Sequence, residues 1–115
     1  MFSSMTRARS VNTRIALANT RKGDMTVTEY VGKMRSLADE MMFSGKPLDD
    51  EELISYILAG LEYYNPIVSA IVSRTDAISV GEVFSQLLSF EQRMELLQND
   101  FGHSVNMTNR GRGGQ

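Results

Sequence analysis

An all-α fold, organised as a compact bundle of about five helices with a disordered C-terminal tail, is what this sequence predicts. Only two of the 115 residues are proline, Pro47 and Pro66, so few positions interrupt a helix. Apolar residues recur at steps of three and four, and N-terminal capping patterns recur along the chain. These observations favour one helical domain over residues 1–99.

The first two helices are predicted from apolar spacing and from capping. Residues 4–21 carry apolar residues at helical steps, namely Met5, Ala8, Val11, Ile15 and Ala18. Thr26 followed by Glu29 is a capping box, so a second helix should begin near Val27 and end at Gly45, just before Pro47. Its apolar stripe consists of Val27, Tyr30, Val31, Met34, Leu37, Ala38 and Met41.

The next two helices are shorter. Asp49 with Glu52 repeats the N-terminal pattern and predicts a helix over residues 51–59 that ends at Gly60. This helix has little polar face, so we expect it to be the most enclosed and the centre of the core. Asn65 followed by Pro66 predicts a short helix that reaches about residue 74.

A third capping box, Ser79 with Glu82, opens a long helix from Val80 to about Asn99. Beyond it the chain loses its apolar periodicity and becomes rich in Gly, Asn and Arg. Burial cannot offset the entropy of ordering such a segment, so residues 100–115 are predicted to be a disordered linker.

The composition excludes several classes of protein. The absence of cysteine removes disulfides and thiolate metal sites. No apolar run approaches the roughly 20 residues that cross a bilayer, so we expect no membrane partner and a cytoplasmic location. The N-terminal 23 residues, basic and free of acids, also have the composition of a mitochondrial transit peptide, which stays an alternative.

The sequence offers little for catalysis. The one histidine, His103, lies in the predicted linker, away from any folded site. The acidic run 49–52 stands where a helix start favours negative charge, and consecutive carboxylates there point in different directions. We therefore predict no enzyme activity, no cofactor, no metal and no small-molecule substrate.

The charges are unevenly distributed along the chain. Residues 1–23 carry a net charge of +5, residues 24–100 carry −9, and the tail carries +2. An acidic body repels polyphosphate, so RNA contacts, weak and non-specific, are expected only at the two basic ends. The candidate RNA-contact residues are Arg7, Arg9, Arg14, Arg110 and Arg112.

Seven short motifs occur in order along the chain and carry a resemblance to a known family. They are LANTRKGD (17–24), MTVTEYV (25–31), LADE (37–40), GKPLDDEEL (45–53), YILAGL (56–61), YNP (64–66) and LLSFE (87–91). Together they resemble the Gag polypeptide of plant copia-type long-terminal-repeat retrotransposons.

The resemblance implies a helical capsid-like segment whose copies self-associate into the shell of a virus-like particle, without catalysis. It also implies a piece truncated at both ends, since the family has further helices upstream and a Cys/His zinc knuckle downstream. The knuckle can be assigned to no residue of this chain, which has no cysteine.

Missing upstream helices would leave apolar faces exposed, and such patches recruit other chains. We therefore expect a homo-oligomer, or association with full-length Gag. The candidate contact residues are Ile15, Met42, Phe43, Tyr63 and Tyr64. A domesticated Gag fragment that docks on another protein partner is a further alternative.

Overall fold

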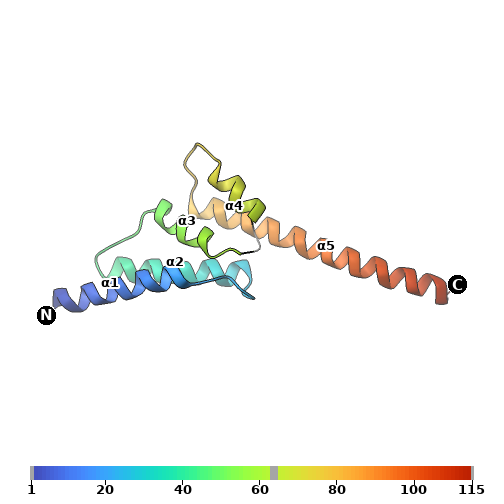
Figure 1. Ribbon diagram of the computed structural model, residues 1–115, viewed down its shortest axis with the longest axis horizontal. Helices are drawn as coiled ribbons and strands as arrows, with labels where there is room; N and C mark the ends of the chain where they lie inside the picture. Colours follow the sequence, from blue (N-terminus) through green and yellow to red (C-terminus); the bar gives the residue numbers. More distant parts are fainter. Residues whose placement is uncertain (1, 63–64, 115) are drawn as a thin grey trace.

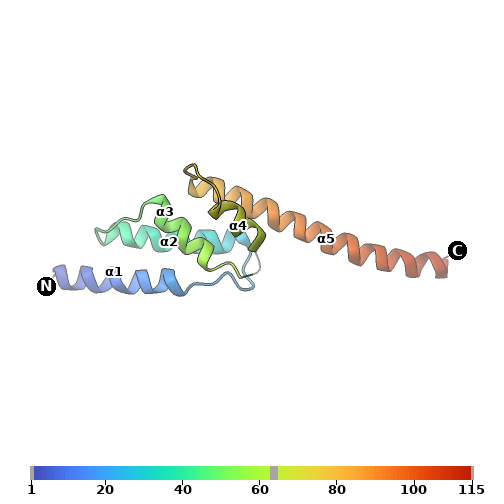
Figure 2. The ribbon, with the colours of Figure 1, turned by 45° about the horizontal axis from the view of Figure 1, so that its top comes forward.

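The computed structural model describes the backbone of residues 2–62 and 65–114 and the side chains of residues 5–62 and 66–99. Five helices follow one another: α1 (Phe2–Asn19), α2 (Val27–Phe43), α3 (Asp50–Ala59), α4 (Asn65–Val72) and α5 (Val80–Gly114). The described residues contain no strand, so the predicted all-α bundle of five helices is confirmed. Figures 1 and 2 show α1 and α2 side by side, while α5 leaves the bundle and extends the chain to 77 Å along its longest axis.

Helix α2 lies at the centre of the bundle, where it contacts α1, α3 and α5. The side chains of its predicted stripe are buried or half-buried. The centre of the core is therefore α2. The prediction that α3 forms this centre is wrong. Helix α3 has 10 residues, and its acidic first turn stays in water, so it buries only Leu53, Ile54 and Ile57.

Three of the predicted helix starts are confirmed, each by a side-chain oxygen that accepts from a backbone N–H three residues later. The pairs are Thr26 with Glu29 (3.1 Å), Asp49 with Glu52 (2.8 Å) and Ser79 with Glu82 (3.1 Å). These bonds satisfy donors that a helix leaves open at its first turn. At the other end of α2, Gly45, where the helix was predicted to end, adopts a left-handed conformation with φ 82°.

Helix α1 packs on the bundle through a largely polar face. Ser10 and Thr13 are buried together with Leu17. The Ser10 hydroxyl donates to the backbone oxygen of Arg7 (2.9 Å), and the Thr13 hydroxyl donates to the Glu40 carboxylate of α2 (3.3 Å). Because both hydroxyls have partners, burying them costs little. The apolar stripe that predicted this helix consequently faces solvent: Met5, Ala8, Val11, Ile15 and Ala18 are exposed.

Helix α5 is longer than the sequence predicts, since its backbone is helical to Gly114 and not only to about Asn99. No proline follows Pro66, so nothing removes a backbone donor from the helix. The side chains of residues 100–115 lie outside the described ones. The division of the chain into a domain over residues 1–99 and a separate linker over residues 100–115 stays a prediction.

Helix α5 also caps α2 across a large sequence separation. The Val27 N–H, in the first turn of α2, donates to the Glu91 carboxylate at 2.8 Å. Replacing Glu91 by alanine should lower the free energy of unfolding by about 1–2 kcal/mol, because the Val27 donor loses a charged acceptor. Urea denaturation measures this loss. The adjacent exposed Gln92→Ala variant should change stability by less than about 0.5 kcal/mol.

Tyr30 is buried on α2, and its hydroxyl donates to the Ile57 backbone oxygen of α3 at 2.7 Å. Burial raises the pKa of Tyr30 to about 12, because the ionised form is poorly solvated inside the protein. The unfolded chain releases this proton near pH 10, so the stability linked to it is fully present below pH 10 and is lost as the pH rises through 12.

We therefore expect the free energy of unfolding to fall by about 1.4 kcal/mol between neutral pH and pH 11 through this group alone. Denaturant titrations of wild type and Tyr30→Phe at both pH values measure it. Between neutral pH and pH 11, the free energy of unfolding of the phenylalanine variant should fall by about 1.4 kcal/mol less than that of wild type. Equal falls in the two proteins would contradict the assignment.

Candidate self-association surface

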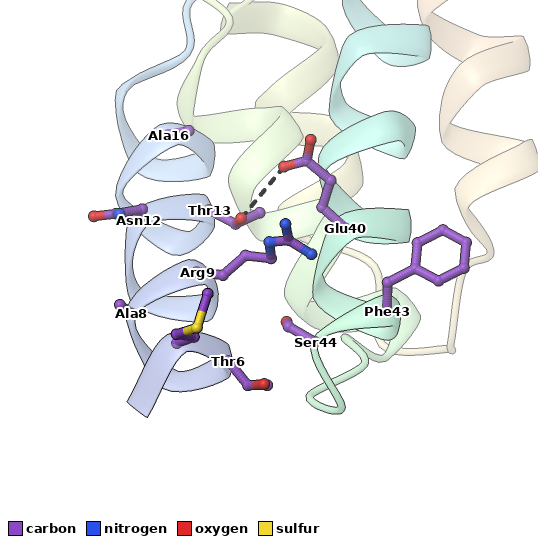
Figure 3. A pocket seen from close by; sticks show the side chains of 10 residues that line it. Thr6, Ala8, Arg9, Asn12, Thr13, Ala16, Glu40, Phe43 and Ser44 are labelled. Carbon is purple, nitrogen blue, oxygen red and sulfur yellow. Dashed lines mark hydrogen bonds between the residues drawn. The ribbon is translucent and has the colours of Figure 1, made fainter. Parts of the chain in front are cut away.

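A groove of about 790 Å³ lies between residues 5–16 of α1 and the end of α2 (Figure 3). Its apolar lining comes from Met5, Ala8, Ala16 and Phe43, and its polar lining includes Arg9 and Glu40. After Gly45 the chain turns back, and the Lys46 N–H donates to the Met41 oxygen at 2.9 Å. The end of α2 therefore stays at the surface beside α1.

The two charged residues of the groove differ in their contacts. The Glu40 carboxylate accepts from Thr13, which ties α2 to α1. The Arg9 side chain reaches from α1 towards α2 (Figure 3), and it has no hydrogen-bond or ion-pair partner among the described side chains. The groove thus combines apolar surface with one guanidinium that is available to an incoming group.

Three of the predicted contact residues are exposed in the structure. Ile15 is 53% exposed on α1, and at the end of α2 Met42 is 56% and Phe43 82% exposed. In Figure 3 the Phe43 ring points away from α1. The other two predicted contact residues, Tyr63 and Tyr64, lie outside the described residues.

The predicted RNA-contact residues of α1 do not gather on one face. Residues seven positions apart share a side of a helix, whereas residues two positions apart lie on opposite sides. Arg7 and Arg14 therefore lie on one side of α1 and Arg9 lies on the other, in the groove. This division could have been found in the sequence, because it follows from the spacing alone. The side chains of Arg110 and Arg112 lie outside the described ones.

Arg14 is already engaged within the molecule. Its guanidinium lies 3.4 Å from the Glu52 carboxylate of α3, and hydrogen bonds to the side chains of Tyr56 and Glu52 raise the pKa of Arg14. Both partners of the ion pair are substantially exposed, so it adds little stability. Arg7 and Arg9 are thus the more available arginines of α1.

Sequence reasoning missed three exposed apolar side chains, Met5 and Val11 on α1 and Val72 on α4. Met94, Leu96 and Leu97 on α5 are also exposed. For these the sequence did carry a signal, since the mixed polar and apolar pattern of residues 91–97 indicates a less enclosed, projecting end of the helix. The described parts of the chain contain no cluster of three or more His, Cys, Asp or Glu residues that could hold a metal ion. None of the helices, as far as they are described, is both long and apolar enough to cross a membrane.

Comparison with known proteins gives one informative similarity. No protein-family model and no solved structure matches the chain. Over 82 residues, 70% of its length, the chain is 27% identical to the retrovirus-related Pol polyprotein from transposon RE1 of Arabidopsis thaliana. The matched stretch covers only 6% of that polyprotein. This similarity supports a retrotransposon origin for the chain.

Proposed function

We propose that the chain is a non-enzymatic, structural Gag fragment of a copia-type retrotransposon that acts by self-association in the shell of a virus-like particle. The observation that carries the proposal is the apolar surface that the bundle leaves open on α1 and at the end of α2. The similarity to a retrotransposon polyprotein and the seven Gag-like motifs support the same assignment.

The physical argument starts from the surface of α1. A helix that buried its apolar stripe inside the bundle would leave only polar residues outside. Here the reverse holds, because Ser10 and Thr13 are buried while Val11 and Ile15 are exposed. Apolar side chains that stay in water within one molecule favour association, since a second chain can cover them. The partner is another copy of this chain or full-length Gag.

Sedimentation velocity at tens of micromolar tests this proposal. We expect a concentration-dependent rise in the sedimentation coefficient, and the double variant Ile15→Asn/Phe43→Asn should shift the distribution towards monomer. The matched control is Val72→Asn, which changes an exposed apolar residue of α4 outside this surface. A single monomeric species at every concentration would contradict the proposal.

The basic charge of the N-terminal 23 residues favours a second candidate function, RNA binding. Residues 1–23 contain five basic residues and no acid, and Arg7 and Arg9 are exposed. Binding through phosphates should weaken steeply with salt. Deleting residues 101–115 and neutralising Arg7, Arg9 and Arg14 should abolish it, as measured by fluorescence anisotropy on a labelled RNA. Unchanged binding after these substitutions would eliminate this function.

A third candidate, docking of a domesticated fragment on a protein partner, rests on the same exposed surface. Co-expression with full-length Gag separates it from self-assembly. A docking fragment should lower the yield of particles, whereas a shell component should be incorporated into them.

A further inference from the structure

The outer part of α5 extends from the bundle with apolar side chains in water. Figures 1 and 2 both show this helix leaving α1–α4. Every side chain over residues 92–99 is exposed, and Met94 and Leu97 are 42% and 63% exposed. These two residues are three positions apart, so they lie next to each other on the helix surface. A helical segment without tertiary packing is marginally stable in water, so a packing partner would stabilise this one.

The α1–α2 groove lies at the opposite end of the molecule from the tip of α5 (Figure 1). Its lining begins at Met5, near the N-terminal end of α1, whereas α5 runs away from the bundle towards the C-terminus. The α5 helix of the same chain points away from the groove. An α5 segment that occupies the groove must therefore come from a second molecule.

Charge favours this pairing over a symmetric contact between two α1 helices. Helix α1 carries three basic residues, Arg7, Arg9 and Arg14, and no acid, so two α1 helices would repel each other. Residues 91–100 carry Glu91, Glu95 and Asp100 against Arg93. The Glu91 carboxylate accepts from Val27 within the bundle, whereas Glu95 is exposed one turn further out. Glu95 is thus complementary to Arg9, which has no hydrogen-bond or ion-pair partner among the described side chains. The groove's own carboxylate, Glu40, already accepts from Thr13.

We propose that the projecting end of α5 of one copy docks in the α1–α2 groove of a second copy, against Met5, Phe43 and Arg9. Met94 lies at the centre of this contact, and Leu97 and Glu95 lie on its two opposite flanks. This inference rests on the proposed self-association and specifies its geometry. The contact is heterologous, because each copy offers a groove at one end and a helix at the other. Repetition of such a contact produces a ring or an open chain of copies.

Charge reversal on each side of the contact tests the pairing in the full chain. Sedimentation velocity should show Glu95→Arg and Arg9→Glu each weakening association by about tenfold, because each places like charges together. The double variant Glu95→Arg/Arg9→Glu should recover most of the wild-type association. The matched controls are Arg7→Glu, on the other side of α1, and Asp39→Arg, on the exposed surface of α2. Both should leave association within about twofold of wild type.

Cysteine crosslinking gives a second, geometric test, since the chain has no cysteine of its own. An affinity-tagged Met5→Cys chain is mixed with an untagged Leu97→Cys chain and oxidised. We expect mixed dimers to predominate over either homodimer. Dominant Met5→Cys homodimers would show a symmetric contact between α1 helices, and an intramolecular crosslink in a Met5→Cys/Leu97→Cys chain at high dilution would show that α5 folds back. Either result overturns the inference.

The outcomes separate this inference from the proposed function. If wild type associates and the charge reversals act no more strongly than Arg7→Glu, the α5–groove contact is wrong while self-association stands. If wild type stays monomeric at all concentrations, the proposed function itself fails.

Discussion

Replacing Gly60 by alanine is expected to lower the free energy of unfolding by about 2–4 kcal/mol. Gly60 is the C-cap of α3, and its carbonyl accepts from the Lys22 N–H at 2.9 Å, which brings the loop after α1 against α3. A Cβ at this position would lie 2.6 Å from the Thr20 backbone oxygen and would overlap the Tyr30 hydroxyl.

The cost has two sources. The Thr20 oxygen belongs to the backbone and can move only with the loop, and overpacking of this kind costs about 1–3 kcal/mol. Displacing the Tyr30 hydroxyl also threatens its hydrogen bond to the Ile57 oxygen, which is worth about 1 kcal/mol. Thermal and urea denaturation followed by circular dichroism measure the sum.

Gly32→Ala is the matched control for Gly60→Ala. Gly32 lies inside α2, and a Cβ there would meet nothing within 4 Å. Alanine should therefore stabilise the helix by about 0.5–1 kcal/mol, through its better helix propensity. A Gly60→Ala protein as stable as wild type would show that the loop of residues 20–25 does not hold this close approach in solution.

Sequence predicts the helix starts of this protein well, because their determinants are local. A capping box needs only residues three positions apart, and Thr26 with Glu29 forms both of its bonds as expected. The stripe of α2 was also predictable, since its apolar residues recur at steps that match the helical period. These signals do not depend on any distant segment.

The packing of α1 could not be predicted in this way. Its apolar stripe indicated a helix, yet the buried face carries Ser10 and Thr13. Burial of Thr13 depends on Glu40 of α2, 27 residues further along the chain, because the Glu40 carboxylate accepts a hydrogen bond from the Thr13 hydroxyl. The Glu91 bond to Val27 spans 64 residues and is equally invisible to local patterns.

The candidate surface was predicted in part for the same reason. Ile15, Met42 and Phe43 were recognised as apolar residues in excess of the core, and all three are exposed. The groove was not predicted, since its walls come from opposite ends of α1 and α2 and exist only once the two helices pack. The role of Met5 and Arg9 as groove-lining residues therefore became visible only in the folded structure.

Truncating Met34 to alanine should lower the free energy of unfolding by about 3–4 kcal/mol. Met34 is fully buried in the middle of α2, the helix that contacts α1, α3 and α5. Removing its side chain loses transfer free energy and leaves a cavity at the point where these helices meet, and buried Met→Ala changes cost about 2–5 kcal/mol. Single domains are stable by about 5–15 kcal/mol, so the loss is a large share of the total.

The matched comparison for Met34→Ala is Met42→Ala, on the same helix and with the same change of side chain. Met42 is 56% exposed, so its truncation should cost less than about 1 kcal/mol in dilute protein, where copies are apart. Urea denaturation of the two variants measures the difference. Equal losses would mean that α2 is not the centre of the core, because only a buried position leaves a cavity when its side chain is shortened.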